Sequence, residues 1–188
     1  DSYSRSIGAL TSLELSNFDF IAGQFDYGNH ERIKDRKYKY IGVVRDPLDR
    51  LISDYYFNQQ SGRADRKKIA KELSLEDYIK FKLSKPNSKL ITSCQIQYLT
   101  GQFDLSKAKE IIDNEYLIAC TTSQLTHCQT VLSKIYNRPD LEPKFINSSK
   151  QKKTHILSDE ITETIEEAFK LDREFIVYIE NKFDSLYL

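Results

Sequence analysis

Residues 38–57 read YKYIGVVRDPLDRLISDYYF, and this stretch decides the fold. Its first seven residues are mostly β-branched or aromatic and stop just before Asp46-Pro47, which predicts a strand. Pro47 suits the first position of a helix, with Asp46 as its N-cap and Asp49 three residues later. Apolar side chains then recur at helical spacing, at Leu48, Leu51, Ile52, Tyr55 and Tyr56. The stretch therefore predicts a strand, a tight turn and a helix.

Predicted strands and helices also alternate along the rest of the chain. Residues 116–120 (YLIAC) predict a second, buried strand, and residues 61–71 predict an exposed basic loop or helix face. The periodicity predicts helices over 74–83, with Ser74 as its N-cap, and over 90–99, 106–113 and 123–136. It also predicts a last amphipathic helix that starts at Ser158 and uses Ile161, Ile165, Phe169, Phe175, Ile176 and Ile179. No linker or repeat divides the chain. We expect one α/β domain over residues 1–188, with a central, mostly parallel sheet flanked by helices.

Composition narrows the function classes. Lys and Arg total 28, as do Asp and Glu, so a formal net charge of +0 gives no general attraction to nucleic acid or to an anionic membrane. No run approaches the roughly 18 apolar residues that a membrane span needs. The three cysteines form no CxxC pair, which indicates neither a zinc site nor a disulfide framework, and we expect no metal. Since the chain begins at Asp1 and holds no Met, we expect it to be a piece of a longer protein.

Arg45 stands where ligands bind in open α/β sheets, beyond the carboxyl end of a strand and before a helix. Its planar guanidinium suits a phosphate, and the helix N-terminus adds positive potential. Ser53 faces the same side if the turn is tight. The alternative is structural, an Arg45–Asp46 pair that braces the turn.

Residues 41–57 resemble the 3′-phosphate-binding segment of the carbohydrate sulfotransferases that include heparan sulfate 2-O-sulfotransferase. The shared pattern is a strand, R-D-P, two variable residues, R-L-x-S and then aromatic residues. Weaker similarity extends to residues 21–30 (IAGQFDYGNH), 97–101 (QYLTG) and 147–149 (NSS).

The resemblance implies a P-loop NTPase-like three-layer sandwich and a sulfuryl donor, 3′-phosphoadenosine 5′-phosphosulfate (PAPS). It implies that Arg45 and Ser53 hold the 3′-phosphate. A loop over residues 147–153 would close over the nucleotide, with the cofactor-binding residues Asn147, Ser148, Lys150 and Lys152. The acceptor would be the hydroxyl of a carbohydrate.

Two departures from the family pattern shape the expectations for catalysis. Members of the family have a P-loop-like K-T-G-x-[ST] segment with a lysine. Residues 4–9 do not match it, and we expect the segment to precede Asp1. The family's G-H is replaced by Gly23-Gln24, and Gln24 can position a hydroxyl but cannot take its proton. The candidates for the general base are therefore Asp26, His30 and Glu31, and histidine is the most common general base in enzymes.

Other basic and aromatic residues bear on the partner. Two basic clusters would suit an anionic glycan, on whose sugars nearby tyrosines could stack. The first, near the proposed active loop, is Arg32, Lys34, Arg36, Lys37 and Lys39, and the second is Arg63, Arg66, Lys67, Lys68 and Lys71. One competing hypothesis is an inactive module that binds a nucleotide or an anionic glycan, and another is a domain with protein partners alone. We expect a cytoplasmic protein, with the lumenal Golgi domain of an anchored protein as the alternative.

Overall fold

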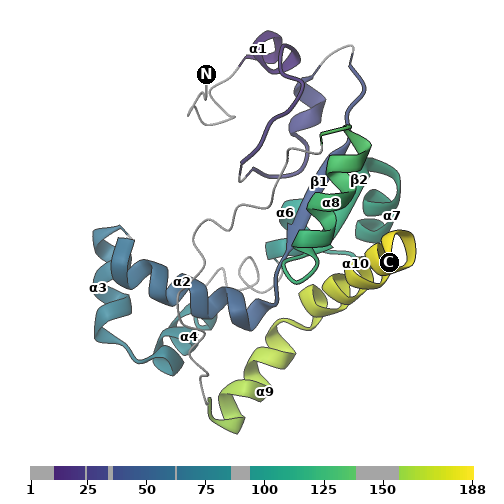
Figure 1. The fold of residues 1–188 in the computed structure, drawn as a ribbon. Helices are drawn as coiled ribbons and strands as arrows, with labels where there is room; N and C mark the ends of the chain where they lie inside the picture. Colours follow the sequence, from purple (N-terminus) through teal and green to yellow (C-terminus); the bar gives the residue numbers. More distant parts are fainter. Residues whose placement is uncertain (1–10, 24, 34–35, 62, 86–93, 139–156) are drawn as a thin grey trace.

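Two parallel strands pair side by side, and helices pack around them (Figure 1). The computed structural model describes all residues except 1–10, 24, 34–35, 62, 86–93 and 139–156. In chain order the elements are α1 (Ser12–Ser16), the 3-10 helix η2 (Asn29–Arg32), β1 (Tyr40–Val44), α2 (Pro47–Ser61), α3 (Ala64–Glu72), α4 (Leu75–Leu83), α6 (Cys94–Thr100), α7 (Leu105–Glu115), β2 (Tyr116–Thr121), α8 (Leu125–Ile135), α9 (Asp159–Ala168) and α10 (Lys170–Tyr187).

The pairing of β1 with β2 leaves no room for a side chain at Gly42. Gly42 is opposite Ala119, and Val44 is opposite Thr121. A Cβ at Gly42 would lie 2.8 Å from both Leu99 Cδ2 and Tyr116 Cε1, closer than carbon atoms can approach. Glycine thus lets α6 and β2 pack closely against the strand.

Helices cover the sheet from two sides. Val44 packs in a buried cluster with Ile96 of α6, Ile112 of α7 and Phe175 of α10. Ile118 and Cys120 of β2 pack instead with Cys128 of α8 and Phe183 of α10, and in Figure 1 α8 lies in front of the two strands. All three cysteines are buried and free.

A second unit of helices extends from the end of β1. In this unit α2 packs on α3 and α4, and α4 contacts α9. Leu51, Ile79, Ile161 and Ile165 form its buried core. This unit fixes the direction of α2, whose N-terminus borders the sheet (Figure 1).

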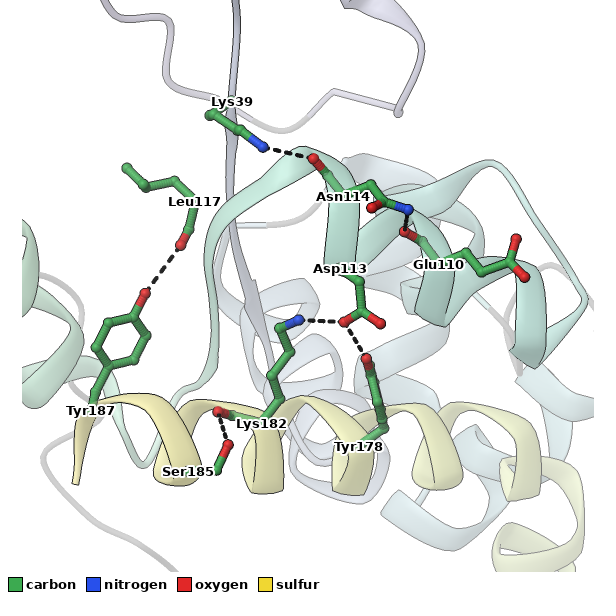
Figure 2. A network of polar contacts seen from close by, with 9 residues as sticks. All are labelled: Lys39, Glu110, Asp113, Asn114, Leu117, Tyr178, Lys182, Ser185 and Tyr187. Atoms are coloured by element: carbon green, nitrogen blue, oxygen red, sulfur yellow. Dashed lines mark hydrogen bonds and ion pairs between the residues drawn. The ribbon is translucent and has the colours of Figure 1, made fainter.

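Polar contacts tie α10 to α7 and to β2 (Figure 2). The Asp113 carboxylate accepts from the Tyr178 hydroxyl and the Lys182 ammonium group. Next to them, Lys39 donates to the Asn114 carbonyl at 2.6 Å, and Tyr187 donates to the Leu117 carbonyl at 3.2 Å. These contacts fix the N-terminal end of β2 and the chain entering β1.

The strand–turn–helix prediction is confirmed, with β1 beginning at Tyr40 rather than at residue 38. The predicted Ser74 cap is also present, since Ser74 Oγ accepts from the Asp77 N–H at 3.1 Å. Residues 64–72 of the basic segment form α3. Part of the predicted 90–99 helix lies outside the described residues, and α6 begins at Cys94.

The prediction of one last helix from Ser158 is right about its start, since Ser158 is the N-cap residue, but wrong about its continuity. The helix is interrupted at Phe169, which separates α9 from α10. Ser158 does not cap it with its side chain, because the Ser158 N–H and hydroxyl donate to Glu76 of α4, at 2.6 Å and 3.3 Å. A tertiary contact with α4 therefore takes the place of a side-chain cap at the start of α9.

The described strands and helices are consistent with an α/β fold with parallel pairing. The described part of the sheet has two strands, so the three-layer sandwich stays a prediction. Within the described residues, no helix combines the length and apolar character that a membrane-spanning segment needs.

An ion pair in the α2–α4 unit predicts a pH effect on stability. Asp54 Oδ2 lies 3.1 Å from Lys82 Nζ and accepts from Tyr78 at 2.7 Å. Burial raises the pKa of Asp54, but Tyr78 and Lys82 outweigh it and hold the pKa below its ordinary value. The stabilisation is therefore present above the unfolded pKa, near 3.8, and is lost as the pH falls through the folded pKa.

We expect Lys82→Met to lower the free energy of unfolding at neutral pH by roughly 0.5–1 kcal/mol. The difference from the unsubstituted protein should vanish in acid, and urea unfolding at a series of pH values measures it. Lys80→Met on the same helix is the control, since Lys80 is exposed and 4.0 Å from Glu160. An equal loss in both variants, at every pH, would contradict the prediction.

Candidate functional site

The turn between β1 and α2 is held by Asp46 and not by an Arg45–Asp46 pair. Asp46 Oδ1 accepts from the Asp49 N–H at 2.9 Å, and the Asp46 carbonyl accepts from the Arg50 N–H at 2.9 Å. The predicted N-cap is therefore present. Among the described residues, Arg45 forms no ion pair with Asp46, so the bracing alternative has no contact to support it.

Arg45 itself has a fixed backbone and an uncommitted side chain. Its N–H donates to Gln95 Oε1 at 2.8 Å, and its carbonyl accepts from Gln95 Nε2 at 2.8 Å. The side chain is half-buried, and its guanidinium makes no hydrogen bond or ion pair within the described part of the chain. An arginine held in this way is available for an anion.

A cavity of about 800 Å³ opens beside Arg45, a size typical of small-molecule sites. It lies between β1, the start of α6 and the segment before β1. Its cationic lining residues are Arg36, Lys37, Lys39, Arg45 and Arg50. The acidic lining residue is Asp19, which is paired with Arg36 at 2.9 Å. The excess of positive charge favours an anionic ligand.

Arg50, one turn into α2, lines the same cavity as Arg45. Its guanidinium lies against the Cys94 thiol. Ser53 is exposed and follows Arg50 by three residues, which places it on the same side of the helix but outside the cavity lining. The structure thus brings Arg45 and Arg50 to one cavity, with Ser53 on the adjoining helical turn.

Asp172, a residue of α10, is fully buried close to Arg50. Its carboxylate accepts from the Ile96 N–H at 3.1 Å and the Gln95 N–H at 3.3 Å, the first turn of α6. Burial raises the pKa of Asp172, partly opposed by these N–H groups and by the charge of Arg50. Asp172 therefore caps α6 from a helix far along the sequence.

His30 lies in an aromatic cluster at another wall of the cavity. Its Nδ1 is 2.6 Å from Tyr40 Oη, and its ring stacks on Tyr38 with centroids 4.3 Å apart. Tyr27 and Tyr38 both donate to Glu115, at 2.7 Å and 3.2 Å. Burial, and contact with Glu115, raise the pKa of both phenols, so they remain donors at neutral pH.

The other predicted catalytic residues are placed differently. Asp26 and Glu31 are exposed and do not line the cavity. Of the base candidates, His30 is thus the one that the structure brings to the cavity wall. Gln24 lies outside the described residues, as do Asn147, Ser148, Lys150 and Lys152.

Three residues of the site were not predicted to act there. Arg50 appears in the sequence pattern without a role, and Gln95 and Asp172 were not singled out. Asp172 did leave a signal, because it interrupts the apolar positions of the last helix between Phe169 and Phe175. A carboxylate in a buried stripe needs partners, which points to a polar contact within the core.

Comparison with known proteins bears on this geometry. Residues 25–116 match a family model described as a sulfotransferase domain. The match supports a sulfotransferase family. No curated protein and no solved structure matches the chain.

The matched sulfotransferase segment runs from before the aromatic cluster to the start of β2 and includes His30, Arg45, Ser53 and Gln95. A sulfotransferase domain has a P-loop-like α/β fold, with which the parallel strands and flanking helices are consistent. The chemistry that it supports is sulfuryl transfer to a hydroxyl. Asp172 lies beyond the matched segment. In the described ranges, no three His, Cys, Asp or Glu side chains gather as metal ligands would.

We expect Asp172→Ala to lower the free energy of unfolding by about 2–4 kcal/mol, because it leaves two buried N–H groups without an acceptor. Asp172→Asn keeps one acceptor oxygen and should cost less. Urea unfolding measures both, with Glu174→Ala, an exposed position on the same helix, as the control. A loss no larger than that of the control would show that the carboxylate is not a structural cap.

Proposed function

We propose that this chain is a sulfotransferase that moves a sulfuryl group from PAPS to a carbohydrate hydroxyl. The observation that carries the proposal is Arg45, a half-buried arginine without a side-chain partner among the described residues, in a cationic cavity within the segment similar to a sulfotransferase domain.

The residues around Arg45 fit the 3′-phosphate of such a donor. The guanidinium offers paired donors to phosphate oxygens, and the N-terminus of α2 adds positive potential beside it. Arg50 contributes a second positive charge to the cavity, and the exposed Ser53 hydroxyl can donate one hydrogen bond. By resemblance to the family, we also expect nucleotide contacts from residues 147–153, which lie outside the described residues.

Sulfuryl transfer requires little covalent chemistry from the protein. The acceptor oxygen forms a bond to sulfur as the bond from sulfur to the bridging phosphate oxygen breaks, which releases 3′-phosphoadenosine 5′-phosphate. Positioning and stabilisation of charge on the sulfuryl oxygens supply most of the acceleration in the analogous phosphoryl transfers. The acceptor proton must also be taken up.

His30 is the base that we propose. With its Nδ1–H directed to Tyr40 Oη, the imidazole keeps the Nε2 lone pair for a proton. Burial raises the pKa of the Tyr40 phenol, so Tyr40 remains neutral while it orients the ring. Glu115, which holds two tyrosines of the cluster, fixes the aromatic wall around His30.

A sugar acceptor suits the remaining lining of the cavity. Tyr38, Tyr98 and Tyr136 line it and are 38%, 45% and 55% exposed, so their rings are open to a ligand. Aromatic faces pack against the apolar faces of sugar rings while hydroxyl groups bond around them. Lys37 and Lys39 add positive charge at the same wall, which favours a sugar that carries anionic groups.

Calorimetric titration with 3′-phosphoadenosine 5′-phosphate, and with adenosine 5′-phosphate as the reference ligand, tests the phosphate site. We expect Arg45→Ala to cost about 2–4 kcal/mol of binding for the first ligand and little for the second. Ser53→Ala should cost less, about 1 kcal/mol.

Arg66→Ala is the matched control, since Arg66 is an exposed arginine of α3 outside the cavity lining. Unchanged affinity in both the Arg45 and Ser53 variants would remove this phosphate site. Binding that discriminates the two ligands, without sulfate transfer to any glycan, would favour the inactive module instead.

Transfer of radiolabelled sulfate from PAPS to a desulfated glycosaminoglycan tests the base. We expect His30→Ala to lower turnover by about 10²–10⁴-fold, the usual contribution of a positioned base, with nucleotide affinity unchanged. Glu31→Gln should retain activity because Glu31 is exposed and outside the cavity lining. If the two variants have equal activity, His30 is not the base.

A further inference from the structure

We propose that Gln95 is the positioning residue of the anion site, and that it acts by fixing the backbone of Arg45. The inference rests on the proposed role of Arg45 in binding the 3′-phosphate. It assigns a function to a residue that touches neither the nucleotide nor the acceptor in that proposal.

The Gln95 carboxamide takes the place of a neighbouring strand. Val44, the last residue of β1, still bonds to the other strand, since its carbonyl accepts from the Thr122 N–H at 2.9 Å. Arg45 is one residue further, and its N–H and carbonyl both bond to Gln95 at 2.8 Å. A carboxamide offers one acceptor and one donor, as a strand residue does. The backbone of Arg45 is thus held as if β1 continued.

This contact fixes the direction in which the Arg45 side chain leaves the backbone, and it leaves the guanidinium unoccupied. Both backbone groups of Arg45 are satisfied, so neither requires a contact from the Arg45 side chain. The rotation of the residue about the strand axis is set, and the side chain emerges beside the N-terminus of α2. Preorganisation of this kind raises affinity because less freedom is lost on binding.

Gln95 is itself rigidly held. Its side chain is buried, with 7% of the residue exposed, and its own N–H donates to the buried carboxylate of Asp172. Asp172 also accepts from Ile96, so the first turn of α6 is tied to α10 at two points. The backbone of Arg45 is therefore held in place by the core of the domain rather than by a loop.

Gln95→Met tests the proposal, because methionine keeps the length and approximate volume of glutamine but neither hydrogen bond. Calorimetry with 3′-phosphoadenosine 5′-phosphate and with adenosine 5′-phosphate is run on the whole chain, alone and with Arg45→Ala. We expect about a tenfold or greater loss for the first ligand, little loss for the second, and no added loss in the Arg45→Ala background.

Gln129→Met on α8 is the control, a half-buried glutamine outside the cavity lining. If Gln95→Met does not fold, Gln95→Asn provides the same comparison, since the shorter carboxamide cannot span both groups of Arg45. Equal losses for the two ligands, or the same loss with and without Arg45, would mean a general structural role and overturn the proposal. Wild-type affinity in the folded variant would overturn it too.

The unsubstituted chain separates this proposal from the one on which it rests. If it binds the two ligands equally, the 3′-phosphate site is absent, and both proposals fall. If it discriminates them and Arg45→Ala abolishes the discrimination, the phosphate site stands, and the Gln95 variants decide the further inference alone.

Discussion

The buried carboxylate of Asp172 is the constraint on which the arrangement of the site depends. It is fully buried and accepts from two N–H groups at the start of α6, so it fixes α6 relative to α10. Gln95 then links α6 to the residue that follows β1. A buried carboxyl group is tolerable when hydrogen bonds satisfy it, and the bonds that satisfy Asp172 join α10 to α6, while the Gln95 side chain joins α6 to the end of β1.

This arrangement separates cations that hold the fold from cations that remain available to a ligand. Arg36 binds the Ser16 and Phe18 carbonyls and Asp19, Lys39 binds the Asn114 carbonyl, and Lys182 binds Asp113. Arg45 differs from these because its backbone, and not its guanidinium, makes the structural contacts within the described residues. The positive charge that lines the cavity is therefore not equally committed to the fold, and within the described residues the guanidinium of Arg45 makes no structural contact.

Local sequence was enough to predict the elements that rest on local contacts. The Asp46 cap, the Pro47 start of α2 and the Ser74 cap depend on residues within three positions, and the structure has all of them. The start of the last helix next to Ser158 was also predicted, but its interruption at Phe169, which is buried in the α2–α4–α9 core, was not. Gln95 and Asp172 also escaped prediction, because their partners lie 50 to 77 positions away along the chain. The Arg45–Asp46 brace found no support because the helix N-terminus competes for the same carboxylate.

The residues of the candidate site are likewise divided between the segment that matches the family model and a distant helix. Residues 25–116 match the sulfotransferase domain model and contain Arg45 and Gln95, whose side chain bonds to the Arg45 backbone. Asp172, which accepts a hydrogen bond from the Gln95 N–H, lies in α10, outside the matched segment. The candidate site thus lies largely in a short stretch of sequence, whereas its geometry also depends on the buried Asp172 of α10. Arg45 lies within the matched segment, and the buried Asp172 in α10 keeps the backbone of Arg45 in place through Gln95.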